Sequence, residues 1–225
     1  MIISVVNEKG GSGKTTIATN LAFKFAQEGI DLMLIDADPQ RSIETLIDFR
    51  INNDLELPFN SMSKIGDSLA KEAKSLENKY DSIIIDTGGR DSKEMRQALI
   101  ISDLVIIPTL ASGYDQAVLN KMLTLVEECS LINTRLKALI LINRASPNPF
   151  LEKKINDLKE YLNEKQIPQN IKIANTIIYE REIYKNVVFE GKSVVELEES
   201  NKAKKEIDML YNELLSYCNN SDQFS

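Results

Sequence analysis

The sequence predicts an α/β fold built on a doubly wound, mostly parallel sheet with helices on both faces. Short runs rich in Ile and Val recur along the 225 residues, and they are apolar throughout rather than alternating. Such runs are typical of strands that are covered on both faces. Between them lie segments whose apolar residues recur at helical spacing. Strand and helix therefore alternate from end to end, which is the order that produces a parallel sheet.

Six apolar runs are predicted as strands: Ile2–Val6, Leu32–Ile35, Ile83–Ile85, Leu104–Ile107, Ala138–Ile142 and Ile171–Ala174. A short edge strand is predicted at Leu57–Phe59, within the irregular stretch from Arg50 to Asn60. Apolar stripes predict helices around Ile17–Phe25, Ile65–Leu76, Val118–Cys129, Leu151–Leu162 and Ile207–Cys218. Since no repeat or low-complexity linker interrupts this pattern, residues 1–218 are predicted to form a single domain. The polar tail, residues 219–225, is expected to fray.

Composition narrows the classes of function. The net charge of −7 provides no overall attraction to nucleic acid or to an anionic membrane, so any DNA contact needs a local basic patch. The absence of histidine excludes His-based catalysis and His-ligated metal. Cys129 and Cys218 are isolated, which argues against a cysteine-held metal cluster and suits a reducing cytoplasm. With neither a signal-peptide pattern nor an apolar run of roughly 20 residues, the chain is predicted to be cytoplasmic.

A glycine-rich string, KGGSGKTT, joins the first predicted strand to the first predicted helix. Its glycines Gly10, Gly11 and Gly13 let successive backbone N–H groups turn toward an anion, and the helix N-terminus adds a partial positive charge. This context predicts a phosphate-binding loop. We expect all its residues to bind a nucleotide: Lys9, Gly10, Gly11, Ser12, Gly13, Lys14, Thr15 and Thr16.

Individual roles follow from the loop chemistry. Lys14 is expected to reach the β- and γ-phosphates, the Thr15 hydroxyl to ligate Mg²⁺, and Thr16 to hydrogen-bond the α-phosphate. The string departs from the general G-x-x-x-x-G-K-[ST] pattern, because Glu8 stands where the first glycine belongs. It also carries an extra lysine, Lys9, at the start of the loop.

Acidic residues follow two of the predicted strands. IDADPQ places Asp36 and Asp38 after one strand, and IIIDTGG places Asp86 after another. A P-loop site needs carboxylates at such strand ends to hold the metal and its waters. We therefore expect Asp36 and Asp86 in the magnesium site and Asp38 beside the attacking water. Gly89 is expected to let its loop close on the γ-phosphate. The alternative is that these acids only cap helices or form turns.

Taken together, these residues resemble the ParA/MinD family of deviant Walker-A P-loop ATPases, and within it the small ParA-type (ParF-like) partition proteins. KGGSGKTT matches the family loop, with its signature lysine at Lys9, while IDADPQ matches the second motif and IIIDTGG the Walker-B motif. ISDLVIIPT and REIYKNVVFEGKSVVE also look like family segments, so the similarity runs from Met1 to about Tyr217. The chain departs from the family where DTGG replaces the usual DTPP.

The resemblance implies a Mg²⁺-dependent ATPase whose cofactors are ATP and Mg²⁺. It implies an ATP-dependent sandwich homodimer in which Lys9 of one subunit reaches the phosphates bound by the other. Lys9, Lys14 and Asp38 then serve catalysis, with Asp38 carrying the hydrolysis step. The adenine is expected to lie against Asn143 and the loop near Ile177–Tyr179. Hydrolysis to ADP and phosphate is expected to be slow without a partner.

The resemblance also implies partition of plasmid or chromosomal DNA in the nucleoid. The ATP dimer would bind nonspecific DNA through Arg181, Lys185, Lys192 and Lys204, with an affinity that falls as salt rises. A small centromere-binding protein (ParB/ParG-like) would stimulate hydrolysis and release the dimer. Interspersed glutamates leave open that these basic residues belong only to a solvated, mixed-charge surface.

Two other functions stay open. One is a MinD-like positioning ATPase that acts at a membrane or on another cargo, although the polar tail favours no membrane contact. The other is a nucleotide-gated scaffold that binds ATP and a protein partner with little hydrolysis. An iron–sulfur reductase relative is excluded because the cysteines lack suitable spacing.

Overall fold

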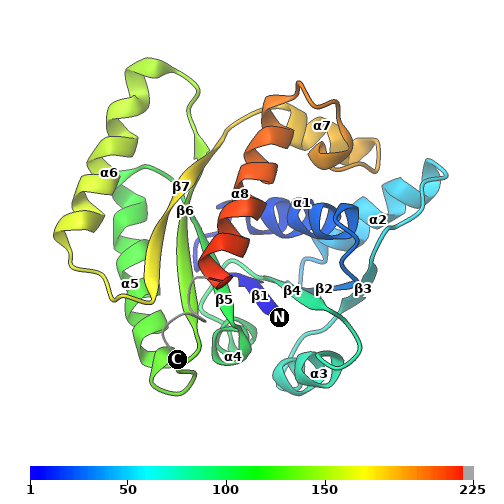
Figure 1. Ribbon diagram of the computed structural model, residues 1–225, viewed down its shortest axis with the longest axis horizontal. Helices are drawn as coiled ribbons and strands as arrows, with labels where there is room; N and C mark the ends of the chain where they lie inside the picture. The colour runs from blue at the N-terminus through cyan, green and yellow to red at the C-terminus, as the bar shows by residue number, and fades with distance from the viewer. Residues whose placement is uncertain (220–225) are drawn as a thin grey trace.

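The computed structural model describes residues 1–219, except the side chains of residues 113, 114, 149 and 219. Its centre is a seven-stranded parallel sheet in the order β3-β2-β4-β1-β5-β6-β7, as Figure 1 shows. The strands are β1 (Ile2–Val5), β2 (Leu32–Ala37), β3 (Asn60–Ser63), β4 (Ser82–Thr87), β5 (Leu104–Thr109), β6 (Lys137–Ala145) and β7 (Ile171–Tyr179). The predicted doubly wound α/β fold is confirmed.

Helices cover both faces of this sheet (Figure 1). One face packs against α1 (Lys14–Gln27), α2 (Ser42–Asn52), α7 (Ile183–Phe189) and α8 (Lys202–Asn219). The other packs against α3 (Leu69–Leu76), α4 (Lys93–Ile101), α5 (Gly113–Ser130) and α6 (Glu152–Glu164). Short 3₁₀ turns, η1 (Pro149–Leu151) and η2 (Val194–Glu196), precede α6 and α8.

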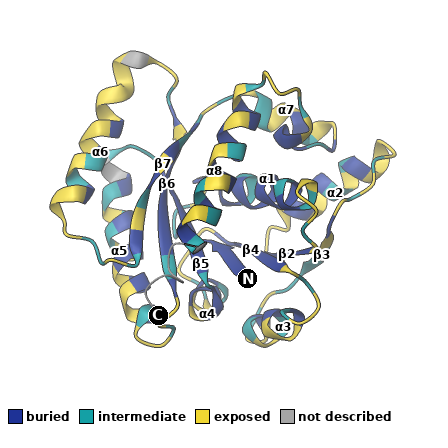
Figure 2. Ribbon diagram, viewed as in Figure 1, coloured by how far each residue is buried: buried dark blue, intermediate teal, exposed yellow. Residues whose placement is uncertain are grey.

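The two cores explain why the strands are apolar at every position. Successive side chains of a strand point to opposite faces of the sheet. In β1, Ile3 and Val5 contact the α1 side, whereas Ile2 contacts the α3 side. Figure 2 shows the central strands buried, with exposure concentrated on the outer helix faces. None of the helices in the described part of the chain is both long and apolar enough to cross a membrane.

Two predicted elements differ from the structure. The edge strand lies at Asn60–Ser63 rather than at Leu57–Phe59. Phe59 instead enters the core, where its ring meets Phe23 edge to face with 5.0 Å between centroids. The third helix begins at Leu69, which leaves Ile65 outside it and partly exposed. The predicted 219–225 tail falls almost wholly outside the described residues, apart from Asn219 at the end of α8.

The strand order creates the site. β1 lies between β4 and β5, so the chain winds outward from β1 in two directions. In open α/β sheets a crevice forms at the carboxyl ends of the strands where the order reverses. The segment that follows β1 carries the glycine-rich string. Of the three predicted carboxylates, Asp36 and Asp86 lie at the carboxyl ends of β2 and β4, and Asp38 directly follows β2.

Candidate nucleotide-binding site

The glycine-rich loop curls between β1 and the first turn of α1. Gly11 and Gly13 have φ angles of 73° and 89°, a region that side chains disfavour. A Cβ added to Gly13 would lie only 2.3 Å from Nδ2 of Asn143, so another residue there would have to displace this side chain. Within residues 1–219, the backbone N–H groups of Ser12 and Gly13 donate to no protein acceptor. The loop therefore offers unpaired donors at a helix N-terminus, which is the chemistry of an anion site.

The two lysines of the loop point in different directions. Lys14 is buried, and its ammonium donates to the Lys9 carbonyl over 3.2 Å. Burial lowers the pKa of Lys14, while the charges of Asp86 and Asp38 act against that shift. The Lys9 ammonium instead forms a 2.7 Å ion pair with Asp115 in the first turn of α5. The Ser112 hydroxyl bonds the other oxygen of Asp115.

Asp86 is the most deeply buried acid of the site. The Thr15 hydroxyl donates to its Oδ2 over 2.6 Å, and its Oδ1 has no partner among the described residues. Burial raises the pKa of Asp86 to about 7, and the hydrogen bond from Thr15 opposes this shift. The charge of Asp36 raises it further. Because buried polar atoms are normally paired, a fully buried carboxylate oxygen without a protein partner, next to a hydroxyl, is suited to bind a cation or a cation-bound water.

Asp36, predicted to belong to the magnesium site, also organises the backbone around it. Its two oxygens accept the N–H groups of Asp38, over 3.0 Å, and of Ile43, over 3.2 Å. It therefore organises the turn after β2 and the first turn of α2. Burial is the largest cause of its raised pKa. Each oxygen accepts one N–H and keeps a further lone pair, so a contact between Asp36 and a metal-bound water stays a prediction.

These residues fit magnesium held mainly by phosphates and water. Mg²⁺ usually keeps several waters and takes only one or two carboxylates beside substrate phosphates. In the described part of the chain, no group of three or more acidic or cysteine side chains is arranged to cage a metal on its own. Thr15 would hold the ion directly and Asp86 through water, and the ion would supply charge neutralisation of the phosphates.

The loop after β4 lies directly on the phosphate loop. A Cβ on Gly89 would approach the Gly10 Cα to 2.8 Å and the Lys14 ammonium to 3.5 Å. A Cβ on Gly88 would contact Asp38 at 3.5 Å. The carboxylate of Asp38 accepts the N–H of Gln40 through Oδ1, and among the described residues no donor meets its Oδ2. The predicted residues from all three strand ends thus converge on one spot.

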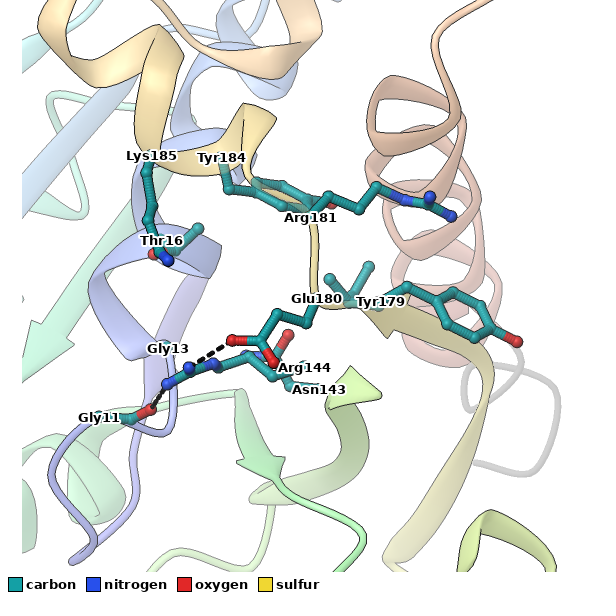
Figure 3. Close-up of a pocket in the computed structure, with 11 residues that line it drawn as sticks. Gly11, Gly13, Thr16, Asn143, Arg144, Tyr179, Glu180, Arg181, Tyr184 and Lys185 are labelled. Atoms are coloured by element: carbon teal, nitrogen blue, oxygen red, sulfur yellow. Dashed lines mark hydrogen bonds and ion pairs between the residues drawn. The ribbon is translucent and has the colours of Figure 1, made fainter. Parts of the chain in front are cut away.

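A cavity of about 260 Å³ adjoins the loop on the side of β6 and β7, as Figure 3 shows. It is lined by Gly11, Gly13, Thr16, Asn143, Arg144, Ile178, Tyr179, Glu180, Arg181, Tyr184 and Lys185. Asn143, Ile178 and Tyr179 line this cavity, whereas Ile177 does not. The segment Ile177–Tyr179, expected as a loop, is the end of β7. Sequence reasoning missed Arg144, Glu180 and Tyr184. The available signal was their position at or near the carboxyl ends of two strands: Arg144 is the penultimate residue of β6, Glu180 directly follows β7, and Tyr184 lies in the first turn of α7.

The four basic residues expected to contact DNA differ in their environment. Lys185 is exposed and Lys192 is half-buried, and they pair with nearby glutamates, Glu182 and Glu190. Arg181 is partly buried and donates to Glu206 over 2.6 Å. Lys204 corrects the expectation, because it is only 5% exposed. Its ammonium is held by the Leu197 carbonyl and the Glu199 carboxylate. A lysine so engaged is a structural residue, and we exclude it from the basic surface.

The buried Asp86 carboxyl leads to a prediction for the nucleotide- and metal-free protein. Its pKa is about 7 in the folded chain, against an ordinary 3.8. Between these values the folded chain keeps a proton that the unfolded chain has released, so the free energy of unfolding falls as pH rises from about 4 to about 7. We expect Asp86→Asn to flatten this slope in urea titrations with a chelator present. Parallel slopes for variant and wild type would contradict the assignment.

Comparison with known proteins agrees with this geometry. The family model for the CobQ/CobB/MinD/ParA nucleotide-binding domain matches residues 3–202. An uncharacterized protein of Methanocaldococcus jannaschii is 32% identical over 250 aligned positions, covering 90% of this chain and 93% of that protein. The maintenance of carboxysome distribution protein A of Halothiobacillus neapolitanus is 27% identical over 216 positions, covering 95% of each.

Solved structures show the same fold. A plasmid partition protein of Borrelia burgdorferi bound to AMPPNP superposes with a TM-score of 0.72 at 22% identity, covering 96% of this chain and 98% of that one. The MinD cell division protein of Aquifex aeolicus superposes with a TM-score of 0.75 at 21% identity, covering 96% and 97%. With the family match spanning most of its length and a phosphate loop of the expected form, this chain belongs to the ParA/MinD family of nucleotide-binding ATPases.

Proposed function

We propose that this protein is a ParA-type, Mg²⁺-dependent ATPase that partitions DNA, hydrolysing ATP to ADP and phosphate. The observation that carries this proposal is the divergence of the two loop lysines. Lys14 lies over its own phosphate loop, whereas the Lys9 ammonium is held away from it by Asp115. Since the Lys9 ammonium does not lie over the phosphate loop of its own subunit, it can contact a nucleotide bound by a second subunit. That arrangement favours a sandwich dimer in which Lys9 reaches the triphosphate of the partner subunit.

The ion pair to Asp115 then opposes dimer formation, because Lys9 must leave it to cross the interface. Bound ATP offsets this cost, because its negative charge lies between Lys14 of one subunit and Lys9 of the other, which would otherwise repel each other. We expect Asp115→Asn, which keeps the shape but removes the charge, to raise the dimer fraction several-fold at subsaturating ATP. Sedimentation velocity with a nonhydrolysable ATP analogue measures this fraction.

Asp67→Asn is the matched control, since Asp67 also pairs with a lysine, Lys93, but lies exposed on the loop between β3 and α3. If Asp115→Asn instead lowers the dimer fraction, Asp115 guides Lys9 in the dimer rather than retaining it in the monomer.

We propose that the ATP-bound dimer binds nonspecific DNA. Arg181, Lys185 and Lys192 lie around α7, and the first two also line the cavity beside the phosphate loop. Basic residues at a nucleotide cavity can change position or partners when that cavity fills, which would make DNA binding depend on ATP. The chromosome-partitioning ATPase Soj of Thermus thermophilus, 25% identical over 205 positions and covering 76% of this chain and 82% of that one, supports the proposal.

Binding to a random-sequence duplex tests it. We expect retention of DNA with ATP and Mg²⁺ but not with ADP, and a steep loss with rising salt because lysines displace counterions from phosphates. The double variant Lys185→Glu/Lys192→Glu should lose most binding. Lys153→Glu/Lys154→Glu, with the same charge change on exposed positions of α6, should not. Equal loss in both variants, or ATP-independent retention, would count against the proposal.

A second candidate function is the positioning of another cargo, which the similarity to the carboxysome distribution protein supports. Both functions use the same dimer, and they differ in the partner. A small DNA-binding protein encoded beside this chain is proposed to stimulate ATP hydrolysis and release the dimer from the nucleoid. Stimulation by such a protein favours partition. Pelleting with liposomes in the presence of ATP would favour a MinD-like activity at a membrane.

A further inference from the structure

Arg144 bridges the phosphate loop and the segment after β7, yet none of the roles above uses it. Its Nη1 donates to the Gly11 carbonyl over 2.8 Å, and its Nη2 donates to Oε1 of Glu180 over 2.6 Å. Figure 3 shows the guanidinium lying between these two partners at the edge of the cavity. Arg144 and Glu180 are both largely exposed, so the ion pair by itself adds little stability.

The backbone of Arg144 is strained at the position from which its side chain makes this bridge. Its φ of 52° lies in the left-handed region, which is uncommon for a residue other than glycine. The register between β6 and β7 shifts at this point, between Ile142 and Ala145. Such irregularities re-aim side chains at strand ends and are frequent beside functional sites.

The bridge has a consequence for the phosphate loop. Asn143 donates to the Ser12 carbonyl over 2.7 Å, so two neighbouring residues hold two successive carbonyls, those of Gly11 and Ser12. In a planar trans peptide the N–H points opposite to the C=O. Holding both carbonyls toward β6 therefore turns the N–H groups of Ser12 and Gly13 to the other side of the loop, where they are free to meet an anion.

We infer that Arg144 is a positioning residue for triphosphate binding: it fixes the Gly11–Ser12 peptide so that the Ser12 N–H faces the phosphates. Glu180 anchors the guanidinium in the required orientation. Arg144 thereby acts through the backbone and not by contact with the base, although it lines the same cavity. The inference rests only on nucleotide binding and is independent of what the ATPase moves.

ATP and inorganic tripolyphosphate, which lacks a base, distinguish a role of Arg144 in positioning the phosphate loop from contact with the base. Arg144→Ala is expected to weaken binding of both ATP and inorganic tripolyphosphate about 10-fold, the loss typical of one hydrogen bond from a charged group. Competition against a fluorescent ATP analogue measures both. In turnover assays KM for ATP should rise while kcat stays near wild type, because the lost interaction serves ground state and transition state alike.

Two further variants refine the test. Arg144→Lys keeps a donor for Gly11 but lacks the planar fork, so it should recover part of the affinity. Arg144→Gly removes the side chain and relieves the strain, and it should show the same loss as Arg144→Ala in a well-folded chain. Arg135→Ala, which removes an exposed arginine paired with Asp103 far from the loop, is the control.

A loss for ATP with none for tripolyphosphate would overturn the inference and assign Arg144 to the base. Unchanged affinity for both ligands would overturn it as well. If the wild-type protein bound tripolyphosphate but no ATP, the proposed ATPase function would fail, and the tripolyphosphate affinities would still decide the role of Arg144.

Discussion

Lys14→Gln should abolish measurable ATP binding. The Lys14 ammonium is buried at the head of α1 and lies within the field of Asp86 and Asp38. Glutamine keeps most of the side-chain length but no charge, so it leaves these carboxylates facing the incoming triphosphate without compensation. Removing one partner from a buried charge cluster costs about 3–5 kcal/mol, which corresponds to a loss of affinity of at least about 100-fold. Isothermal titration calorimetry with Mg²⁺ and ATP measures this loss.

The control is Lys71→Gln, on the exposed face of α3. It should bind ATP as the wild type does. Binding by Lys14→Gln within threefold of wild type would show that the loop does not hold the phosphates, and the proposed function would fall with it. The same variant should also lose ATP-dependent DNA retention, since the proposed dimer forms only around bound nucleotide.

Asp38→Ala should separate ATP binding from ATP hydrolysis. The Asp38 carboxylate lies beside Gly88 and keeps one oxygen free of protein donors in the described structure. It is therefore placed to orient a water, while Lys14 and the loop amides hold the triphosphate without it. General acid–base or water-orienting groups typically contribute about 10²–10⁴-fold, so we expect a loss of that order in kcat. ATP affinity should change by less than a few-fold.

Single-turnover hydrolysis of radiolabelled ATP measures this effect, with Asp67→Ala as a control acid outside the site. Equal turnover by Asp38→Ala and wild type would favour the alternative of a nucleotide-gated scaffold. Under the proposed mechanism, Asp38→Ala dimers with bound ATP should also stay on DNA, because their release needs hydrolysis.

Much of the site follows from local sequence. The glycine string and the carboxylates at the carboxyl ends of β2 and β4 could be predicted because each motif is contiguous and parallel strands end at one edge of the sheet. The edge strand could not be located, since Asn60–Ser63 is polar and is defined by its backbone pairing with β2. Phe59, which looked like part of that strand, is drawn into the core by Phe23.

The sequence by itself determined the family, the sheet with its helical layers and the residues able to bind phosphate, because these depend on short motifs and on hydrophobic period. Only the tertiary structure decided which of those residues form hydrogen bonds or ion pairs with other parts of the protein. The pairing of Lys9 with Asp115, the hydrogen bonds to both oxygens of Asp36 and the burial of Lys204 all depend on partners from other segments. The bridge made by Arg144 belongs to the same class, because it joins residues more than 130 positions apart. Such contacts arise only when distant strand ends meet, so no local pattern reveals them.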